Sequence, residues 1–127
     1  MPASQARIVL STVGAEQQAR SIARLLVDER LAACVNIIGP IRSIYRWRDA
    51  VEDETEFLLL IKTRAILLPR LERRLIELHS YEVPEMLALA PSGGSPAYLA
   101  WLVESTAAKP LRIAPRAAHR RGGRGRG

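Results

Sequence analysis

The sequence predicts a single α+β domain in which elements follow the order β-α-β-β-α-β and one further helix ends the fold. Two observations support this class. Short apolar segments typical of strands alternate with longer amphipathic segments of helical period, and 127 residues suffice for one domain and no more. A third observation, that some strand segments are apolar on both faces, predicts that both faces of the sheet are covered.

The N-terminal part predicts one strand and one helix. Residues 7–12 form the short apolar run of a buried strand. Residues 15–29 repeat apolar side chains at helical spacing, so they predict a helix with one apolar face. We expect Gly14 to cap this helix, with Glu16 in the first turn, where a carboxylate stabilises the helix dipole.

The middle of the chain predicts a long hairpin-like pair of strands. Residues 32–38 are an apolar run, and residues 41–48 alternate between two faces. The Gly39-Pro40 pair between them predicts a bulge or bend. The acidic residues 49–54 predict a turn.

The C-terminal part predicts strand, helix, strand and helix. Residues 56–63 are a strand that is apolar on both faces. The second main helix is expected to begin near Ile66, because Pro69 has no N–H and fits only a first turn. Residues 86–90 predict the last strand and residues 97–105 a short helix. The complete order is the ferredoxin-like one, in which both main helices pack on one face of an antiparallel sheet.

The second face of this sheet also needs a cover. Residues 57–61 and 86–90 place apolar side chains on both faces. A folded part of about 105 residues cannot cover both faces with two helices and a short one. The economical cover is another copy of the chain, which predicts an oligomer. The alternative is that the C-terminal helix folds across this face alone.

The basic charge of the chain lies at its C-terminal end. The net charge is +6, and residues 107–127 hold seven Lys or Arg and no acidic residue. We expect residues 1–106 to form a nearly neutral domain and residues 107–127 to be a disordered Arg/Gly-rich tail. Such a tract can bind RNA weakly, although a solvated extension without function is the favoured interpretation. No other nucleic-acid binding is expected.

The sequence predicts a cytoplasmic protein that does not enter a membrane. Cys34 is the single cysteine, so no disulfide forms within the chain, and this fits a reducing compartment. The N-terminus shows no signal peptide. No apolar run approaches the ~18 residues of a membrane span.

The sequence does not predict an enzyme. It contains neither a Gly-x-Ser-x-Gly motif nor a Walker A loop. Residues 12–15 lack the Arg that the phosphate loop of a ferredoxin-like acylphosphatase requires. Cys34 and His79 could form a thiol nucleophile pair, but Cys34 lies in an apolar run, where burial keeps a thiol unreactive.

Residues 79–85 form the most distinctive cluster of the chain. They place one imidazole, one phenol and two carboxylates within seven residues, and Pro84 prevents a continued helix. These groups suggest metal or ligand binding. The alternative is a hydrogen-bonded polar corner after a helix.

Five segments closely resemble the CutA family of divalent-cation tolerance proteins. They are residues 29–37, 43–47, 62–64, 79–85 and 96–101, which follow one another in order, and the resemblance as a whole runs from about Ile8 to Thr106. The resemblance implies a ferredoxin-like protomer in a homotrimer. It also implies tolerance to copper and other divalent cations, with metal ions bound in some members, and no established reaction.

The resemblance suggests candidate metal ligands. His79 corresponds to a histidine that many members share, and Cys34 to the cysteine of their Ala-Ala-Cys motif. His79 with Glu82 or Glu85 could bind Cu(II) or another divalent ion weakly, since imidazole and carboxylate suit these ions. Cys34 is the weaker candidate, because a small buried residue also explains it.

The aromatic residues suggest a second possibility. A groove between subunits could be lined by Tyr45, Trp47, Lys62, Tyr81 and Trp101, and it would suit a small anion or another polar ligand. Trimeric ferredoxin-like signalling proteins of the PII type resemble this design, by fold analogy alone, and bind effectors between subunits. The alternative is that these aromatic side chains pack the trimer interface.

Overall fold

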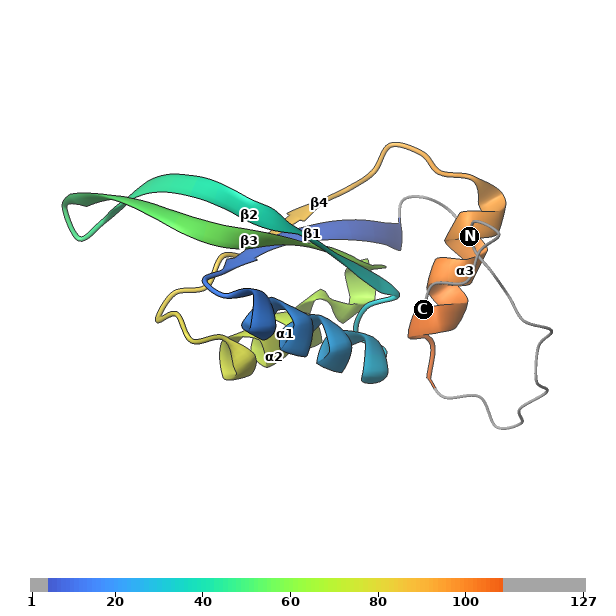
Figure 1. Ribbon diagram of the computed structural model, residues 1–127. Coiled ribbons are helices and arrows are strands. Elements are labelled where there is room, and N and C mark those ends of the chain that lie inside the picture. The colour runs from blue at the N-terminus through green and yellow to red at the C-terminus, as the bar shows by residue number, and fades with distance from the viewer. Residues whose placement is uncertain (1–4, 109–127) are drawn as a thin grey trace.

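The computed structural model describes residues 5–108, which form one antiparallel sheet with two helices on one face (Figure 1). The strands, in the spatial order β2-β3-β1-β4, are β1 (Ala6–Val13), β2 (Cys34–Trp47), β3 (Ala50–Arg64) and β4 (Leu87–Leu89). The helices are α1 (Glu16–Asp28), the short η2 (Ala65–Leu67), α2 (Leu68–Leu78) and α3 (Pro96–Thr106). This order confirms the predicted α+β class and the βαββαβ pattern with an extra C-terminal helix.

The predicted tail of residues 107–127 lies outside the described residues from residue 109 onward.

Strands β2 and β3 form a long hairpin whose outer half, residues 41–56, projects beyond the rest of the sheet (Figure 1). We call this outer half the arm. The two strands predicted at 32–38 and 41–48 are in fact one continuous strand, β2, which pairs with β3. The irregularity expected at Gly39-Pro40 is confirmed, because the register shifts between Ile38 and Ile41.

The acidic turn predicted at residues 49–54 is wrong. Only Arg48 and Asp49 turn the chain, both with positive φ, and β3 already begins at Ala50. A two-residue turn with positive φ at both positions matches the twist of a hairpin. The acidic residues remain in the strand because they pair across it: Asp53 lies 2.9 Å from Arg42.

Helix α1 begins one residue later than predicted, and Gly14 does not cap it. The N-cap position is Ala15, which provides no side-chain hydrogen bond. Helix α2 begins as Pro69 requires, with the proline in its first turn. At α3 the Ser95 hydroxyl accepts a hydrogen bond from the Tyr98 N–H at 3.3 Å.

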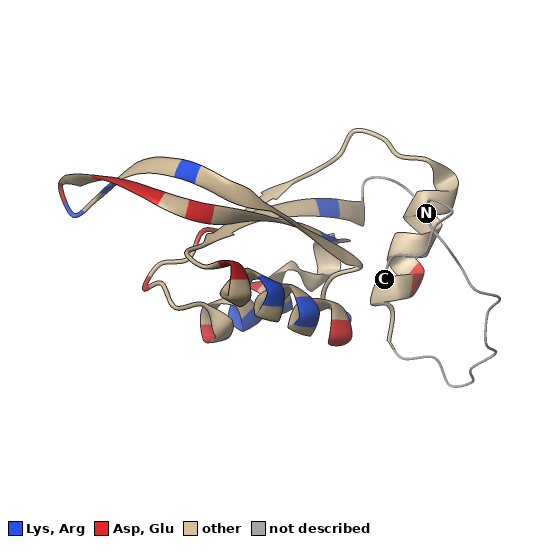
Figure 2. Cartoon of the chain, in the orientation of Figure 1, with Lys and Arg blue, Asp and Glu red and all other residues tan. Residues whose placement is uncertain are grey.

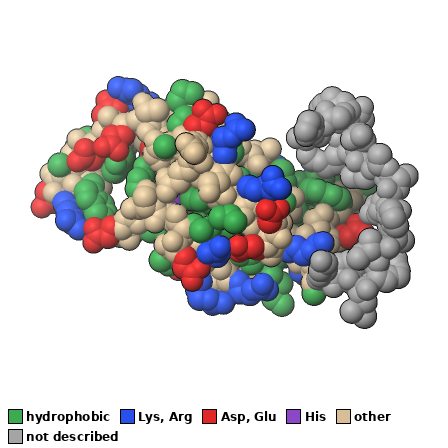
Figure 3. All heavy atoms as spheres, turned by 60° about the horizontal axis from the view of Figure 1, so that its bottom comes forward, with side chains coloured by type: hydrophobic (Ala, Val, Ile, Leu, Met, Phe, Trp, Pro, Cys, Tyr) green, Lys and Arg blue, Asp and Glu red, His purple; other side chains and the backbone are tan. Residues whose placement is uncertain are grey.

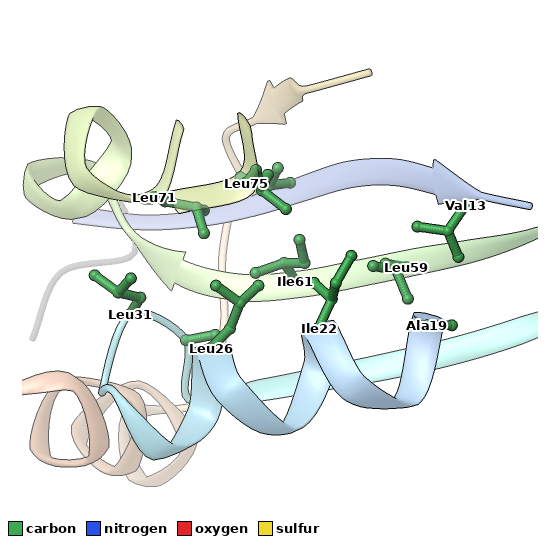
Figure 4. Packing of buried hydrophobic residues seen from close by; sticks show 11 residues of the cluster. Val13, Ala19, Ile22, Leu26, Leu31, Leu59, Ile61, Leu71 and Leu75 are labelled. Atoms are coloured by element: carbon green, nitrogen blue, oxygen red, sulfur yellow. The ribbon is translucent and has the colours of Figure 1, made fainter. Parts of the chain in front are cut away.

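The hydrophobic core lies between the sheet and helices α1 and α2 (Figure 4). Its fully buried members come from both helices and from β1 and β3: Val9, Val13, Ala19, Leu26, Leu59, Ile61 and Leu71. Each buried Leu or Ile contributes about 1.5–3 kcal/mol of transfer free energy. A smaller cluster joins Leu99 and Leu102 of α3 to Ala6 and Ala33 at one end of the sheet.

The face of the sheet away from α1 and α2 stays open. Alternation along each strand and the cross-strand register place six apolar side chains on it: Ile8, Leu10, Leu58, Leu60, Leu87 and Leu89. Leu87 and Leu89 keep 58% and 50% of their surface exposed. Helix α3 lies at the end of the sheet and not across this open face (Figure 1). The alternative in which α3 alone covers it is therefore wrong.

Candidate functional site

A pocket of about 820 Å³ lies between the arm and the loop that follows α2. An opening beside the projecting hairpin is visible in Figure 3. The arm contributes residues 42–45, Trp47 and Glu56, and the loop contributes residues 80–83 and Glu85. The end of β1 contributes Thr12. Acidic residues follow the β3 side of the arm (Figure 2).

His79 anchors the loop to the end of β1. Its Nε2 lies 2.7 Å from the carbonyl oxygen of Thr12, and its Nδ1 accepts a hydrogen bond from the Tyr81 N–H at 3.0 Å. Because Nδ1 accepts, Nε2 carries the proton and donates it to Thr12. The residue is 8% exposed, and both ring nitrogens have partners inside the protein. In this arrangement His79 has no free lone pair for a metal ion.

Tyr81 and Glu56 form a short hydrogen bond at the back of the pocket. The Tyr81 hydroxyl donates to Glu56 Oε2 at 2.6 Å. Burial, followed by this hydrogen bond and the negative charge of Glu56, raises the pKa of Tyr81 well above its usual value. The space for the hydroxyl comes from Gly14, since a Cβ there would lie 3.1 Å from Tyr81 Oη. The phenol therefore stays protonated and serves as a donor.

The two loop carboxylates have different partners. Glu82 Oε1 lies 2.7 Å from Arg48 Nη2 at the tip of the arm, and both side chains are exposed. Glu85 Oε1 is 3.5 Å from the hydroxyl of Thr12. Within residues 5–108, no group of three or more His, Cys, Asp or Glu side chains is placed to hold a metal ion. The predicted ligands His79, Glu82 and Glu85 thus share a loop without converging on one point.

Two aromatic side chains of the arm border the pocket. The Tyr45 hydroxyl donates to Glu54 at 3.0 Å. This hydrogen bond, with burial and the charges of Glu54, Glu56 and Glu52, raises the pKa of Tyr45. The guanidinium of Arg48 lies 5.0 Å from the ring centroid of Trp47, within range of a cation–π interaction.

Three of the predicted site residues lie away from this pocket. Cys34 and Lys62 are paired across β2 and β3 near the opposite end of the sheet, and both contact the side-chain carbonyl of Asn36. Trp101 lies on α3, where its ring centroid is 5.3 Å from that of Tyr98. The structure therefore brings together Tyr45, Trp47 and Tyr81 of the five predicted groove residues.

Glu56, which the sequence analysis did not single out, lines the pocket. It is 5% exposed although it directly precedes an apolar run. Alternation along β3 did not reveal it, because alternation places Glu56 on the face opposite to Leu59 and Ile61, and its contact with Tyr81 comes from a loop 25 positions away. An acidic residue at the first position of the predicted apolar strand was the signal available.

No helix within residues 5–108 is long and apolar enough to cross a membrane.

A family model described as CutA1 divalent ion tolerance protein matches residues 7–105. The divalent-cation tolerance protein CutA of Thermus thermophilus is 50% identical over 99 residues, which are 78% of this chain and 96% of that protein. Protein CutA of Mus musculus is 45% identical over 91 residues, which are 72% of this chain. The match spans 51% of the mouse protein, so the chain corresponds to about half of that relative's length.

Solved structures agree with this similarity. The T. thermophilus divalent cation tolerance protein has a TM-score of 0.78 at 49% identity, over 80% of this chain and 99% of that one. CutA from Xylella fastidiosa has a TM-score of 0.79 at 39% identity, over 82% of this chain and 100% of that one. The names of relatives differ in compartment, since one from Arabidopsis thaliana is called chloroplastic and one from Archaeoglobus fulgidus periplasmic.

Proposed function

The chain belongs to the CutA1 family of divalent ion tolerance proteins, and from this premise we propose that it takes part in the response to divalent metal ions. In this proposal the protein acts as a homotrimer that binds copper or another divalent ion weakly. A binding role is favoured over catalysis, because the relatives are named for tolerance to cations and not for a reaction. A cytoplasmic location stays a prediction.

The open face supports self-association. A monomer in water would leave the apolar side chains of β1, β3 and β4 partly exposed, with Leu87 and Leu89 about half uncovered. Packing the same face of further copies against it removes this surface from water. A homotrimer is the assembly that the family resemblance implies.

The described residues do not fit a closed metal site of high affinity. His79 would have to give up its hydrogen bond to Thr12 or to Tyr81 before it could bind a metal ion. Cys34 lies in a different part of the sheet. What remains are the loop carboxylates Glu82 and Glu85, which line the pocket without converging, so that each could hold an ion only weakly, together with several water molecules. This pair is the observation that carries the proposal of weak metal binding.

Calorimetric titration of the full chain with Cu(II) and with Zn(II) tests this proposal. The double variant Glu82→Gln, Glu85→Gln should lower the affinity about fivefold or more, because one or two carboxylates supply the protein ligands. The matched control is Glu16→Gln, Glu72→Gln, which removes the same charge from the exposed faces of α1 and α2. Every protein in the series carries His119→Ala, so that the second histidine of the chain does not contribute.

An equal loss of metal affinity in the loop variant and in the control variant would contradict a site at Glu82 and Glu85. Absence of any Cu(II) or Zn(II) binding would contradict the metal-binding proposal as a whole. Sedimentation of the full chain at micromolar concentration tests the assembly independently, and a monomer would contradict the homotrimer.

A second candidate function is binding of a small effector, as in PII-type signalling proteins. The pocket of about 820 Å³ favours it, because its volume lies within the range of small-molecule sites. In a trimer the arm and the loop would lie near neighbouring copies, so the complete site would form between subunits.

A further inference from the structure

Glu56 is a buried carboxylate without a cationic partner. It is 5% exposed, and within residues 5–108 its only hydrogen bond is the one that Oε2 accepts from Tyr81. Within residues 5–108, Ser11 Oγ is the only polar side-chain atom that is both fully buried and without a hydrogen bond. The other oxygen of Glu56, Oε1, has no hydrogen bond either, so it must be partly accessible to solvent. Oε1 therefore keeps access to the pocket that Glu56 lines. A buried carboxylate is costly unless it is paired.

The neighbouring charges do not compensate Glu56. Three carboxylates and one guanidinium line the pocket. The guanidinium, that of Arg42, is 2.9 Å from Asp53 on the opposite strand. Glu82 is already paired with Arg48. Glu56 and Glu85 thus remain without a cation among the described residues, and an anionic ligand would be repelled here.

Three aromatic side chains also line the pocket. Tyr45 and Trp47 lie on the arm, and Tyr81 lies on the loop. Electron-rich ring faces attract weakly hydrated organic cations, and this attraction offsets the hydration that the cation loses on binding. The chain itself provides an example, since the Arg48 guanidinium lies over Trp47 at 5.0 Å while it is paired with Glu82.

We propose that this pocket binds a small organic ammonium ion, with the Glu56 carboxylate as its counter-ion and Tyr45, Trp47 and Tyr81 as its aromatic walls. This inference names the ligand class for the second candidate function and does not depend on metal binding. A hydrated metal ion gains little from aromatic faces, and tight binding of it needs converging donors, which residues 5–108 do not provide. An alkylammonium ion uses both the rings and the carboxylate.

The negative charge of Glu56 also acts on the two tyrosines. Burial is the first cause of the raised pKa of Tyr81, and the hydrogen bond and charge of Glu56 add to it. The pKa of Tyr45 is raised first by its hydrogen bond to Glu54, with the charge of Glu56 among the further causes. A field that opposes phenolate formation favours a bound cation.

Choline provides the test, because it is a quaternary ammonium ion with an uncharged carbon isostere, dimethylbutanol. Both are titrated into the full chain in the presence of EDTA at constant ionic strength, and binding is followed by NMR shifts of the Trp47 indole N–H. We expect choline to bind and dimethylbutanol to bind about tenfold more weakly or not at all, as a cation–π and counter-ion site requires. Equal binding of the two compounds, or binding of neither, would overturn the proposal.

Variants locate the charge that matters. Glu56→Gln should weaken choline binding about tenfold, because it removes the buried counter-ion, whereas Glu72→Gln on the exposed surface of α2 should not change it. Arg48→Gln should strengthen binding about two- to threefold, since it removes a competing cation held by an exposed ion pair. If Glu56→Gln does not fold, Glu85→Gln takes its place with an expected loss of about threefold. Unchanged choline affinity in the folded variant would overturn the assignment.

Discussion

The two halves of strand β3 have opposite environments. From Phe57 to Arg64 the strand crosses the core, where Leu59 and Ile61 are fully buried under α1 and α2. From Ala50 to Glu56 it belongs to the arm, where most residues are exposed and the buried Glu56 lines the pocket. One strand thus contributes to stability in its second half and to the candidate site in its first. Substitutions in the two halves should therefore have different consequences.

The largest difference in stability should come from truncating one apolar side chain in the core and one in the arm. Leu71→Ala in the core should lower the free energy of unfolding by about 2–5 kcal/mol, because it leaves a cavity under the sheet. Ile44→Ala in the arm, where the side chain is 68% exposed, should change it by less than about 0.5 kcal/mol. Urea unfolding at equal protein concentration measures both. A comparable loss at Ile44 would show that the arm is packed against another copy.

A smaller effect on stability, one that depends on pH, is expected for Tyr81 beside the pocket and not for residues of the core. The pKa of Tyr81 is raised in the folded protein. The folded phenol therefore keeps its proton at pH values at which the unfolded phenol, with its ordinary pKa of about 10, loses it. Its contribution to stability is complete below that pH and is lost as the pH rises toward the folded pKa. The difference in melting temperature between the parent and Tyr81→Phe should shrink above about pH 10.

A constant difference across that range would contradict the assigned pKa shift. Leu71→Ala provides the control, because it removes no titrating group and should shift the melting temperature without changing its pH dependence.

The smallest effect should be a gain of stability within the core. The Ser11 hydroxyl is fully buried and has no hydrogen-bond partner within residues 5–108. Ser11→Ala removes this unpaired group at little cost in volume, so it should raise the free energy of unfolding by about 1 kcal/mol. Thermal unfolding of the variant beside the parent measures this change. A loss of stability instead would reveal a partner for the hydroxyl in the assembled protein.

The candidate site was only partly accessible to sequence reasoning. The cluster at residues 79–85 predicted a functional loop, and its Tyr81, Glu82 and Glu85 do line the pocket. His79 was expected to be a metal ligand, yet its two nitrogens bond to Thr12 and Tyr81. Sequence shows which residue types are near in the chain, whereas the ring N–H of His79 donates to a carbonyl oxygen 67 positions away. Which interpretation of the cluster applies depends on such distant partners.

The sequence by itself determined the class and order of the elements, because periodicity of apolar residues and the position of Pro69 are local properties. It also determined that the second face of the sheet is apolar. Tertiary structure alone decided that residues 50–54 continue a strand, since their charges pair with Arg42 and Tyr45 across the hairpin. It also decided the burial of Glu56, because the loop after α2 brings Tyr81, 25 positions away in the chain, against this carboxylate. Long-range pairing sets the register, and register places the groups of the site.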